Sequence, residues 1–131
     1  ARTALARARA LRLQERWTDA VAALESAPAG PATDIEHARI AFERGDSAVA
    51  QEVLDAFLAR YPDHVDAGEA HYLRGWLYFR AGDDGAALEV WRDGIARHPV
   101  TESLFSQKAY LTMIRQNWSI ETVGGSNSDT P

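Results

Sequence analysis

The stretch GDSAVAQEVLDAFLARYP at residues 45–62 is followed 37 residues later by a related stretch, GDDGAALEVWRDGIARHP, at residues 82–99. Both begin with Gly-Asp, place an Ala four residues after the Asp, and place large apolar residues eight and twelve residues after it. Both end in Pro. Agreement of this kind at one fixed spacing is typical of a protein built from structural repeats. We therefore predict a repeat architecture.

A fainter copy lies upstream of these two. Trp17 to Leu24 resembles the second half of the unit, Ala8 takes a small position, and Glu15-Arg16 stands where the other copies have Gly-Asp. This copy precedes the middle one by 30 residues instead of 37. We expect about three copies, with a first loop that is shorter or differently built.

Each unit has the pattern of two helices joined by a short turn. In the middle unit, apolar residues recur at helical spacing from Ile35 to Phe42 and again from Val49 to Leu58, on either side of Gly45-Asp46. Glycine readily adopts the left-handed conformation that ends a helix, and aspartate caps the start of the next one. Proline then ends the second helix. The predicted helices are 2–15, 18–26, 34–44, 47–60, 66–81, 84–97 and 101–117.

Small residues recur at one position of each helix. The first helices of the pairs carry Ala8, Ala38 and Gly75, and the second helices carry Ala20, Ala50 and Ala87. Two antiparallel helices joined by a short turn approach closely only where one of them presents such a residue. A single pair cannot bury its apolar face alone, so we expect neighbouring pairs to stack.

These residues resemble the tetratricopeptide repeat, which has a small residue in its first helix, Gly-Asp at the turn, and Ala, a large apolar residue and Pro in the second half. The third copy matches best, with Gly75, Tyr78, Gly82-Asp83, Ala87, Trp91 and Pro99. It departs at Arg74, where Leu is usual, and at Gly94, where Ala is usual. The middle copy has Phe57 where a small residue is usual.

The resemblance covers roughly residues 2–117 and implies an all-α fold. The expected architecture is an antiparallel helix-pair superhelix, a tetratricopeptide-like α-solenoid of about three repeats plus a C-terminal capping helix. Residues 1–118 would form this domain and residues 119–131 a C-terminal tail. The tail is rich in Gly, Ser, Asn, Asp and Thr, which is typical of disorder. If it is ordered, it would pack on its own repeats or on those of a neighbour through Trp118, Ile120 and Val123.

The joint between the middle and third copies is similar to a 37-residue variant of the repeat found in bacterial cell-envelope proteins. It comprises residues 53–63 followed by Ala67, Ala70, His71, Tyr72 and Gly75. Proteins with this variant include the periplasmic Tol–Pal-associated coordinator proteins and the outer-membrane assembly lipoproteins. The similarity implies a role in a bacterial envelope assembly.

The composition disfavours several classes of protein. Of the 131 residues, 46% are hydrophobic and 25% are charged, which suits one domain with a buried core. The net charge of −5 disfavours nucleic-acid binding, which uses basic surfaces. No stretch approaches the roughly 20 apolar residues of a membrane span, so we expect no direct membrane insertion. The chain has no cysteine, and its location stays open between the periplasm and the cytoplasm, because such a chain is stable in either redox setting.

No group of residues has the pattern of an active site. The four histidines, His37, His64, His71 and His98, do not form a metal-binding spacing such as H-E-x-x-H. His71 takes a position where the resembling family often has Trp, which favours packing. Helix capping explains the acidic pairs in the turns. We therefore predict that the chain is not an enzyme and holds no cofactor and no metal.

The resemblance also implies a binding surface, because the first helix of each pair lines the inner face of such a superhelix. Carried over position by position, this face holds Arg2, Leu5, Arg9, Arg12, Leu13, Ile35, Arg39, Phe42, Glu43, Glu69, Tyr72, Trp76, Phe79 and Arg80, with Ala109, Met113 and Gln116 from the last helix. Arginine and aromatic residues are enriched at binding hot spots. The predicted partner-binding residues are Arg9, Arg12, Arg39, Phe42, Tyr72, Trp76, Phe79 and Arg80.

The predicted function is a scaffold that binds an extended or helical segment of a protein partner in a concave groove. Trp76 and Tyr72 would anchor the segment, and acidic groups of the partner would lie near Arg9, Arg39 or Arg80. For Phe42 and Phe79, packing between neighbouring helices is the alternative. For the whole chain, the alternatives are a structural module that self-associates through its end helices and a regulatory domain of a larger protein.

Overall fold

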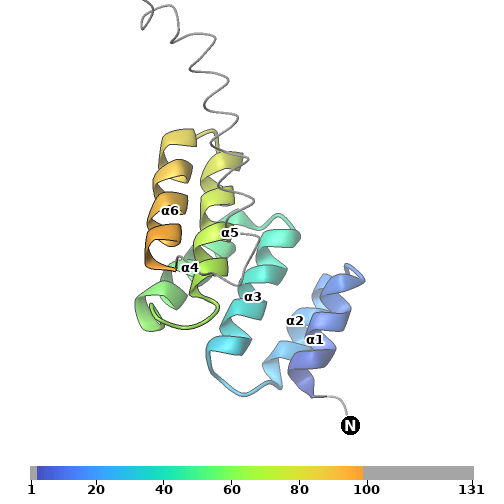
Figure 1. The fold of residues 1–131 in the computed structure, drawn as a ribbon. Coiled ribbons are helices and arrows are strands. Elements are labelled where there is room, and N and C mark those ends of the chain that lie inside the picture. The colour runs from blue at the N-terminus through green and yellow to red at the C-terminus, as the bar shows by residue number, and fades with distance from the viewer. Residues whose placement is uncertain (1–2, 99–131) are drawn as a thin grey trace, which may run out of the picture.

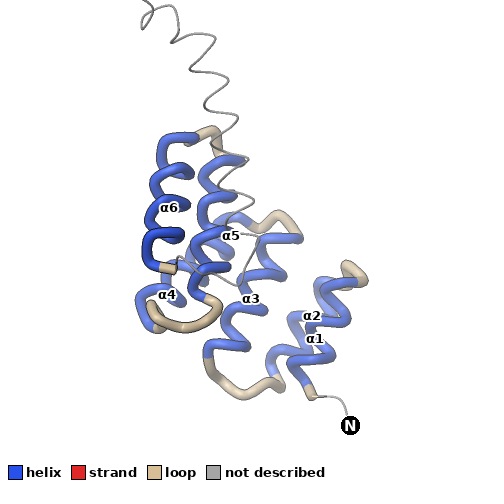
Figure 2. Tube along the Cα trace, viewed as in Figure 1, coloured by secondary structure: helices blue, strands red, loops and turns tan. Residues whose placement is uncertain are grey.

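The computed structural model describes residues 3–98, and these form six α-helices without a strand (Figures 1 and 2). The helices are α1 (Ala4–Leu13), α2 (Trp17–Glu25), α3 (Pro31–Glu43), α4 (Ser47–Arg60), α5 (Ala67–Arg80) and α6 (Asp84–Arg97). Each corresponds to a predicted helix, with ends that differ by at most three residues. The predicted helix 101–117 and the predicted tail 119–131 lie outside the described residues.

The largest difference is at the start of α3. The helix begins at Pro31, three residues before the predicted start, and Gly30 precedes it with extended backbone. Proline suits the first position of a helix because its φ angle is already helical and its missing N–H has no partner in the first turn. Pro31 thus starts a helix, a role different from the one predicted for Pro62 and Pro99 at the ends of the second helices.

The helices pair as hairpins, and the hairpins stack. Helices α1 and α2, α3 and α4, and α5 and α6 pack against each other, while α2 contacts α3 and α4 contacts α5. The first helices of the hairpins also contact each other in the order α1, α3, α5 (Figure 1). This is the predicted all-α stack of helix pairs.

The turns inside the hairpins follow the predicted chemistry. Gly45 and Gly82 have φ angles of 87° and 85°, in the left-handed region that favours glycine. The side chains of Asp46 and Asp83 accept hydrogen bonds from the backbone N–H groups of Val49 and Ala86, at 3.4 and 3.1 Å. Each Gly-Asp pair therefore ends one helix and starts the next.

The first hairpin is shorter than the other two mainly because its second helix, α2, is short. Helix α2 has 9 residues, whereas α4 and α6 have 14 each. The loop after α2 spans residues 26–30 and the loop after α4 spans residues 61–66. We expected a shorter loop to explain why the first copy precedes the middle one by 30 residues instead of 37. This expectation was wrong for most of the difference, because α2 is five residues shorter than α4 and the loop after it is only one residue shorter.

The small residues lie where helices cross. Ala8, Ala20, Ala38, Ala50 and Ala87 are all fully buried. The largest apolar cluster lies between α3, α4 and α5 and contains the buried side chains of Leu54, Phe57 and Leu77. Two smaller clusters hold the ends of the stack, one between α1 and α2 and one around Trp91.

Gly75 shows why one of these positions is a glycine. A Cβ atom placed there would lie 2.0 Å from Nε1 of Trp91, so the indole occupies the space of a side chain. The same Nε1 donates a hydrogen bond to the backbone oxygen of Tyr72 at 3.0 Å. The close approach of α5 and α6 therefore depends on this glycine.

Candidate functional site

A groove runs along the face formed by α1, α3 and α5, and it consists of two adjoining hollows. The first, with a volume of about 440 Å³, is lined by Arg12, Arg39, Phe42, Glu43, Glu69, Tyr72 and Leu73. The second, of about 340 Å³, is lined by Phe42, Tyr72, Trp76, Phe79 and Arg80. We call them the charged hollow and the aromatic hollow. Because Phe42 and Tyr72 line both, the two hollows make one groove.

The aromatic hollow is built by side chains one turn apart on α5. The ring centroid of Trp76 lies 6.4 Å from that of Tyr72 and 5.2 Å from that of Phe79, and both pairs are edge-on. Trp76 also packs edge-on against the buried Trp91 on α6, at 5.3 Å. Edge-on pairs of this kind are favourable beyond the area they bury. The Trp76 ring is therefore held in place from three sides and remains partly exposed.

Arg80 closes one end of the aromatic hollow. Its guanidinium carbon lies 3.9 Å from the centre of the Phe42 ring, and its Nη1 donates to the backbone oxygen of Phe42 at 3.3 Å. A cation over an aromatic face is attracted by the ring quadrupole. The residue is exposed, and these two contacts keep its charge beside the aromatic side chains.

The charged hollow is organised around a carboxylate that is entirely buried. Glu36 on α3 is 0% exposed and accepts hydrogen bonds from Arg12 on α1 and Arg39 on α3. Arg12 also donates to Glu43 at 2.7 Å, and Arg39 donates through two nitrogens to Glu69 on α5. The hydrogen bonds that Arg39 donates to Glu69 raise the pKa of Arg39 above its usual value, although burial acts in the opposite direction. The network links α1, α3 and α5.

This network decides which predicted arginines are available to a partner. Arg12 is buried and Arg39 is mostly buried, and carboxylates of the chain itself neutralise both. Arg9 is half exposed, with its Nε 3.6 Å from a Glu36 oxygen. Arg80 forms no ion pair with any residue between 3 and 98, and it lines the aromatic hollow.

The remaining predicted residues lie in the groove and also pack. Phe42 and Tyr72 pack against the large apolar cluster, and Phe79 packs against the cluster of Trp91. Each is only partly buried. Packing and lining the groove are therefore compatible for these side chains. The residue that sequence reasoning missed is Glu36, whose signal was its position three residues before Arg39 on one helix.

The histidines have separate surroundings. His64 accepts a hydrogen bond from the backbone N–H of Asp66 at 3.0 Å, within the loop after α4. His71 is buried between α5 and α6, where burial lowers its pKa to about 4. Within residues 3–98, no three side chains of the metal-binding types come together.

No helix in the described part of the chain is both long enough and apolar enough to cross a membrane.

The comparisons with known proteins matched residues 35–100 to the family model described as tetratricopeptide repeat. No curated protein and no solved structure matched the chain. Tetratricopeptide repeats generally mediate protein–protein interactions, and the family is typically a non-enzymatic scaffold. The matched segment covers half of the chain and includes α4, α5 and α6, and the stacked helix pairs agree with it. The chain belongs to the tetratricopeptide repeat family.

Proposed function

We propose that the groove along α1, α3 and α5 binds an extended or helical segment of a protein partner. The observation that carries this proposal is the aromatic hollow, in which Trp76 is held by three aromatic neighbours and still partly exposed. A side chain that is already ordered loses little conformational entropy on binding. Tryptophan, tyrosine and arginine also dominate binding hot spots.

The two hollows would contribute different terms to binding. The aromatic hollow offers apolar area and one exposed cation, Arg80. The charged hollow offers arginines and carboxylates that already pair, so an acidic group of the partner would compete there with Glu36, Glu43 and Glu69. An acidic group is therefore best received by Arg80, and less well by Arg39.

The test is a capture experiment with the intact chain, followed by affinity measurements with the captured and purified partner. Replacing Trp76 by Ala should weaken binding by a factor of about 30 or more, since a hot-spot truncation removes about 2 kcal/mol or more. Arg92→Ala, on the exposed side of α6, is the matched control and should leave the affinity unchanged. Circular dichroism would confirm that both variants fold.

An unchanged affinity of a folded Trp76→Ala variant would remove Trp76 as the anchor. Arg80→Ala provides a second measurement that does not depend on the core, because the side chain is exposed. Light scattering on the same samples tests self-association. A tight dimer that captures no other protein would favour the structural module instead.

We also propose that this binding serves a bacterial envelope assembly. The support is the similarity of residues 53–75, which form the end of α4, the loop and the first half of α5, to the 37-residue variant of the repeat. Fractionation of cells that carry the native gene is the test. Recovery of the protein and its partner from the cytoplasm alone would contradict this proposal and leave the groove proposal intact.

A further inference from the structure

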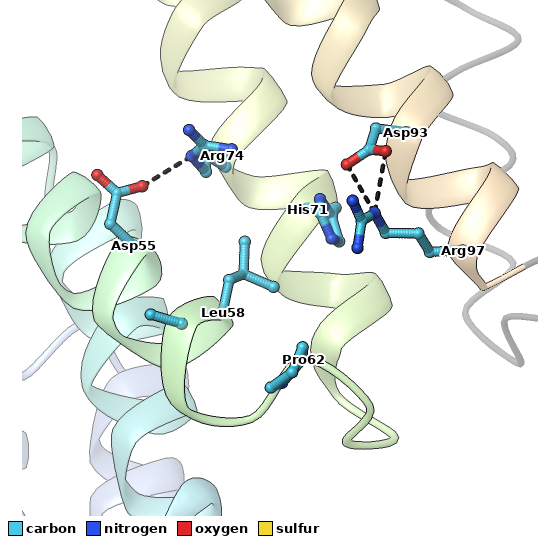
Figure 3. Close-up of a pocket in the computed structure, with 8 residues that line it drawn as sticks. Asp55, Leu58, Pro62, His71, Arg74, Asp93 and Arg97 are labelled. Carbon is cyan, nitrogen blue, oxygen red and sulfur yellow. Dashed lines mark hydrogen bonds and ion pairs between the residues drawn. The ribbon is translucent and has the colours of Figure 1, made fainter.

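A second pocket lies on the opposite side of α5 from the groove. It has a volume of about 390 Å³ and lies between α4, α5 and α6 (Figure 3). Helix α5 contributes His71 and Arg74 to this pocket, and Tyr72, Trp76 and Phe79 to the groove. Since an α-helix turns by about 100° per residue, the mean directions of these two sets lie about 140° apart around the helix axis. The pocket is therefore separate from the site described above.

The pocket is where the third repeat departs from the sequence pattern of its family. Arg74 lines it where Leu is usual, and His71 lines it where Trp is common. Gly94 lies directly behind His71, because a Cβ atom at Gly94 would be 2.6 Å from Cβ of His71. Gly94 stands 37 residues after Phe57, which is a buried core ring in the middle repeat. The pocket thus has the polar side chains of His71 and Arg74 where the family pattern has apolar ones, and Gly94 leaves room beside His71.

His71 forms the inner part of the pocket, and one of its ring nitrogens is buried without a polar partner among residues 3–98. The residue is 8% exposed, and the nitrogen is Nδ1. A buried polar atom without a partner is unfavourable by about 1–3 kcal/mol, so such atoms are rare in native proteins. The residues around the ring are His98, with ring centroids 5.7 Å apart, and the charged Arg74, Asp93 and Arg97. Burial is the main reason that the pKa of His71 is low, and the imidazole is neutral near pH 7.

Two arginines flank His71, and each forms an ion pair with an aspartate. Arg97 also donates hydrogen bonds to Asp93, whereas Nε of Arg74 has no hydrogen-bond partner within residues 3–98. Figure 3 shows Arg74 with Asp55 on one side of the ring and Arg97 with Asp93 on the other. The contacts run through Nε, at 2.7 Å for Arg74 and 3.0 Å for Arg97, so neither contact uses the outer edge of the guanidinium group. The side chains of both aspartates are about half exposed. Pairs this exposed contribute about 0–1 kcal/mol and rearrange easily.

The wall opposite the charges is apolar. Leu58 and Ala59 at the end of α4 and Pro62 in the following loop line it. Two guanidinium groups, the carboxylates of Asp55 and Asp93, one neutral imidazole and an apolar wall therefore face one space. The two aspartates offset the two arginine charges, so net charge attracts no anion to the pocket and a ligand must be recognised by the geometry of its hydrogen bonds. A planar carboxylate matches the fork of a guanidinium group.

We propose that this pocket binds a monocarboxylate with a small apolar body. The carboxylate lies between the guanidinium groups of Arg74 and Arg97 and accepts a hydrogen bond from His71. The apolar part of the ligand packs on the wall formed by Leu58 and Pro62. Such a carboxylate belongs either to a free small acid or to a glutamate side chain of another protein.

The test is an NMR titration of the intact protein, with the imidazole signals of His71 as the readout. One arm uses sodium butyrate, with sodium chloride at equal ionic strength as its reference. The other arm uses the capped peptide acetyl-Gly-Glu-Gly-amide. Either ligand should give a saturable shift and raise the pKa of His71 by about one unit or more, because a nearby carboxylate favours the protonated ring.

The variants separate a built site from a salt effect. Arg74→Leu introduces the residue usual in the family and should abolish saturation, whereas Arg92→Leu on α6 and Trp76→Ala in the groove should preserve it. Arg97→Leu is the second variant, since its exposed side chain is not needed for folding. Saturation by butyrate alone identifies a free acid, and saturation by the peptide alone identifies a side chain. Shifts that do not saturate, or that persist in both arginine variants, would overturn the proposal.

Discussion

Gly75 allows a close approach between α5 and α6. The Trp91 indole fills the place of its missing side chain and donates a hydrogen bond to the backbone of α5. Both contacts are lost if the helices separate. The packing of α5 against α6 in the third hairpin therefore depends on residue 75 having no side chain.

Replacing Gly75 by Ala should lower the free energy of unfolding by about 2–3 kcal/mol, since overpacking of a core contact is unfavourable by about 1–3 kcal/mol. Gly85→Ala is the matched control on α6, where the nearest atom to a new Cβ is 4.0 Å away. The control should stabilise the protein by about 0.5–1 kcal/mol through helix propensity. Urea unfolding of both variants measures the difference, and equal stabilities would show that the helices adjust freely.

His71 makes stability depend on pH. Its pKa is 6.5 in a model peptide and falls to about 4 in the folded protein, because burial disfavours the charged ring. The folded state thus binds this proton less readily than the unfolded chain. The contribution of neutral His71 to the free energy of unfolding is therefore fully present above pH 6.5, and it is lost as the pH falls toward 4.

The loss over this pH window should amount to as much as about 3 kcal/mol, at about 1.4 kcal/mol per pKa unit. Urea unfolding above and below the window should show it in the intact chain and show less of it in His71→Asn. The variant isolates the contribution of the histidine from that of every other group in the chain. A pH dependence that is identical in both proteins would contradict this role of His71.

At the level of the elements, the turn within the first hairpin differs from the other two turns at both of the residues that are Gly-Asp there. Gly45 and Gly82 occupy the left-handed region in the second and third hairpins, and Glu15 occupies it in the first with a φ of 60°. A side chain in this region is disfavoured. The following Arg16 makes no side-chain cap to α2, unlike Asp46 and Asp83 in the other turns.

Replacing Glu15 by Gly should therefore stabilise the protein by about 1 kcal/mol, because it relieves the left-handed backbone of a residue with a Cβ. Gly45→Ala is the reverse change at the equivalent turn and should destabilise it by a similar amount. Thermal unfolding of both variants checks the pair. The two changes in unfolding temperature should have opposite signs. A Glu15→Gly variant that is less stable than the original chain would mean that the flexibility of glycine in the unfolded chain outweighs the backbone strain removed at residue 15.

At the level of the whole molecule, Glu36 holds the stack together by charge. Glu36 is fully buried and forms ion pairs with Arg12 and Arg39. Arg39 also forms an ion pair with Glu69 on α5. The buried apolar residues form three clusters, and the largest of them spans the second and third hairpins. The network is thus a polar connection between all three hairpins.

Replacing Glu36 by Gln should lower the free energy of unfolding by about 3 kcal/mol or more, since breaking a buried pair leaves its partner charge without compensation. Asp93→Asn breaks the exposed pair with Arg97 and should change stability by less than about 1 kcal/mol. The readout is urea unfolding at low and high salt. Salt should weaken the exposed pair and leave the buried network nearly unaffected.

The sequence by itself determined the repeat, the helices and the Gly-Asp turns within residues 3–98, because these depend on neighbours a few residues apart. It also indicated the face on which Phe42, Tyr72, Trp76 and Phe79 lie, because helical spacing sets which residues share a face. Only the tertiary structure decided which arginines are neutralised. Arg12 meets Glu36 across 24 residues and Arg39 meets Glu69 across 30, and neither distance has a local signal. The pocket around His71 could not be predicted from the sequence for the same reason. Its walls come from α4, α5 and α6, which lie together only in the tertiary structure.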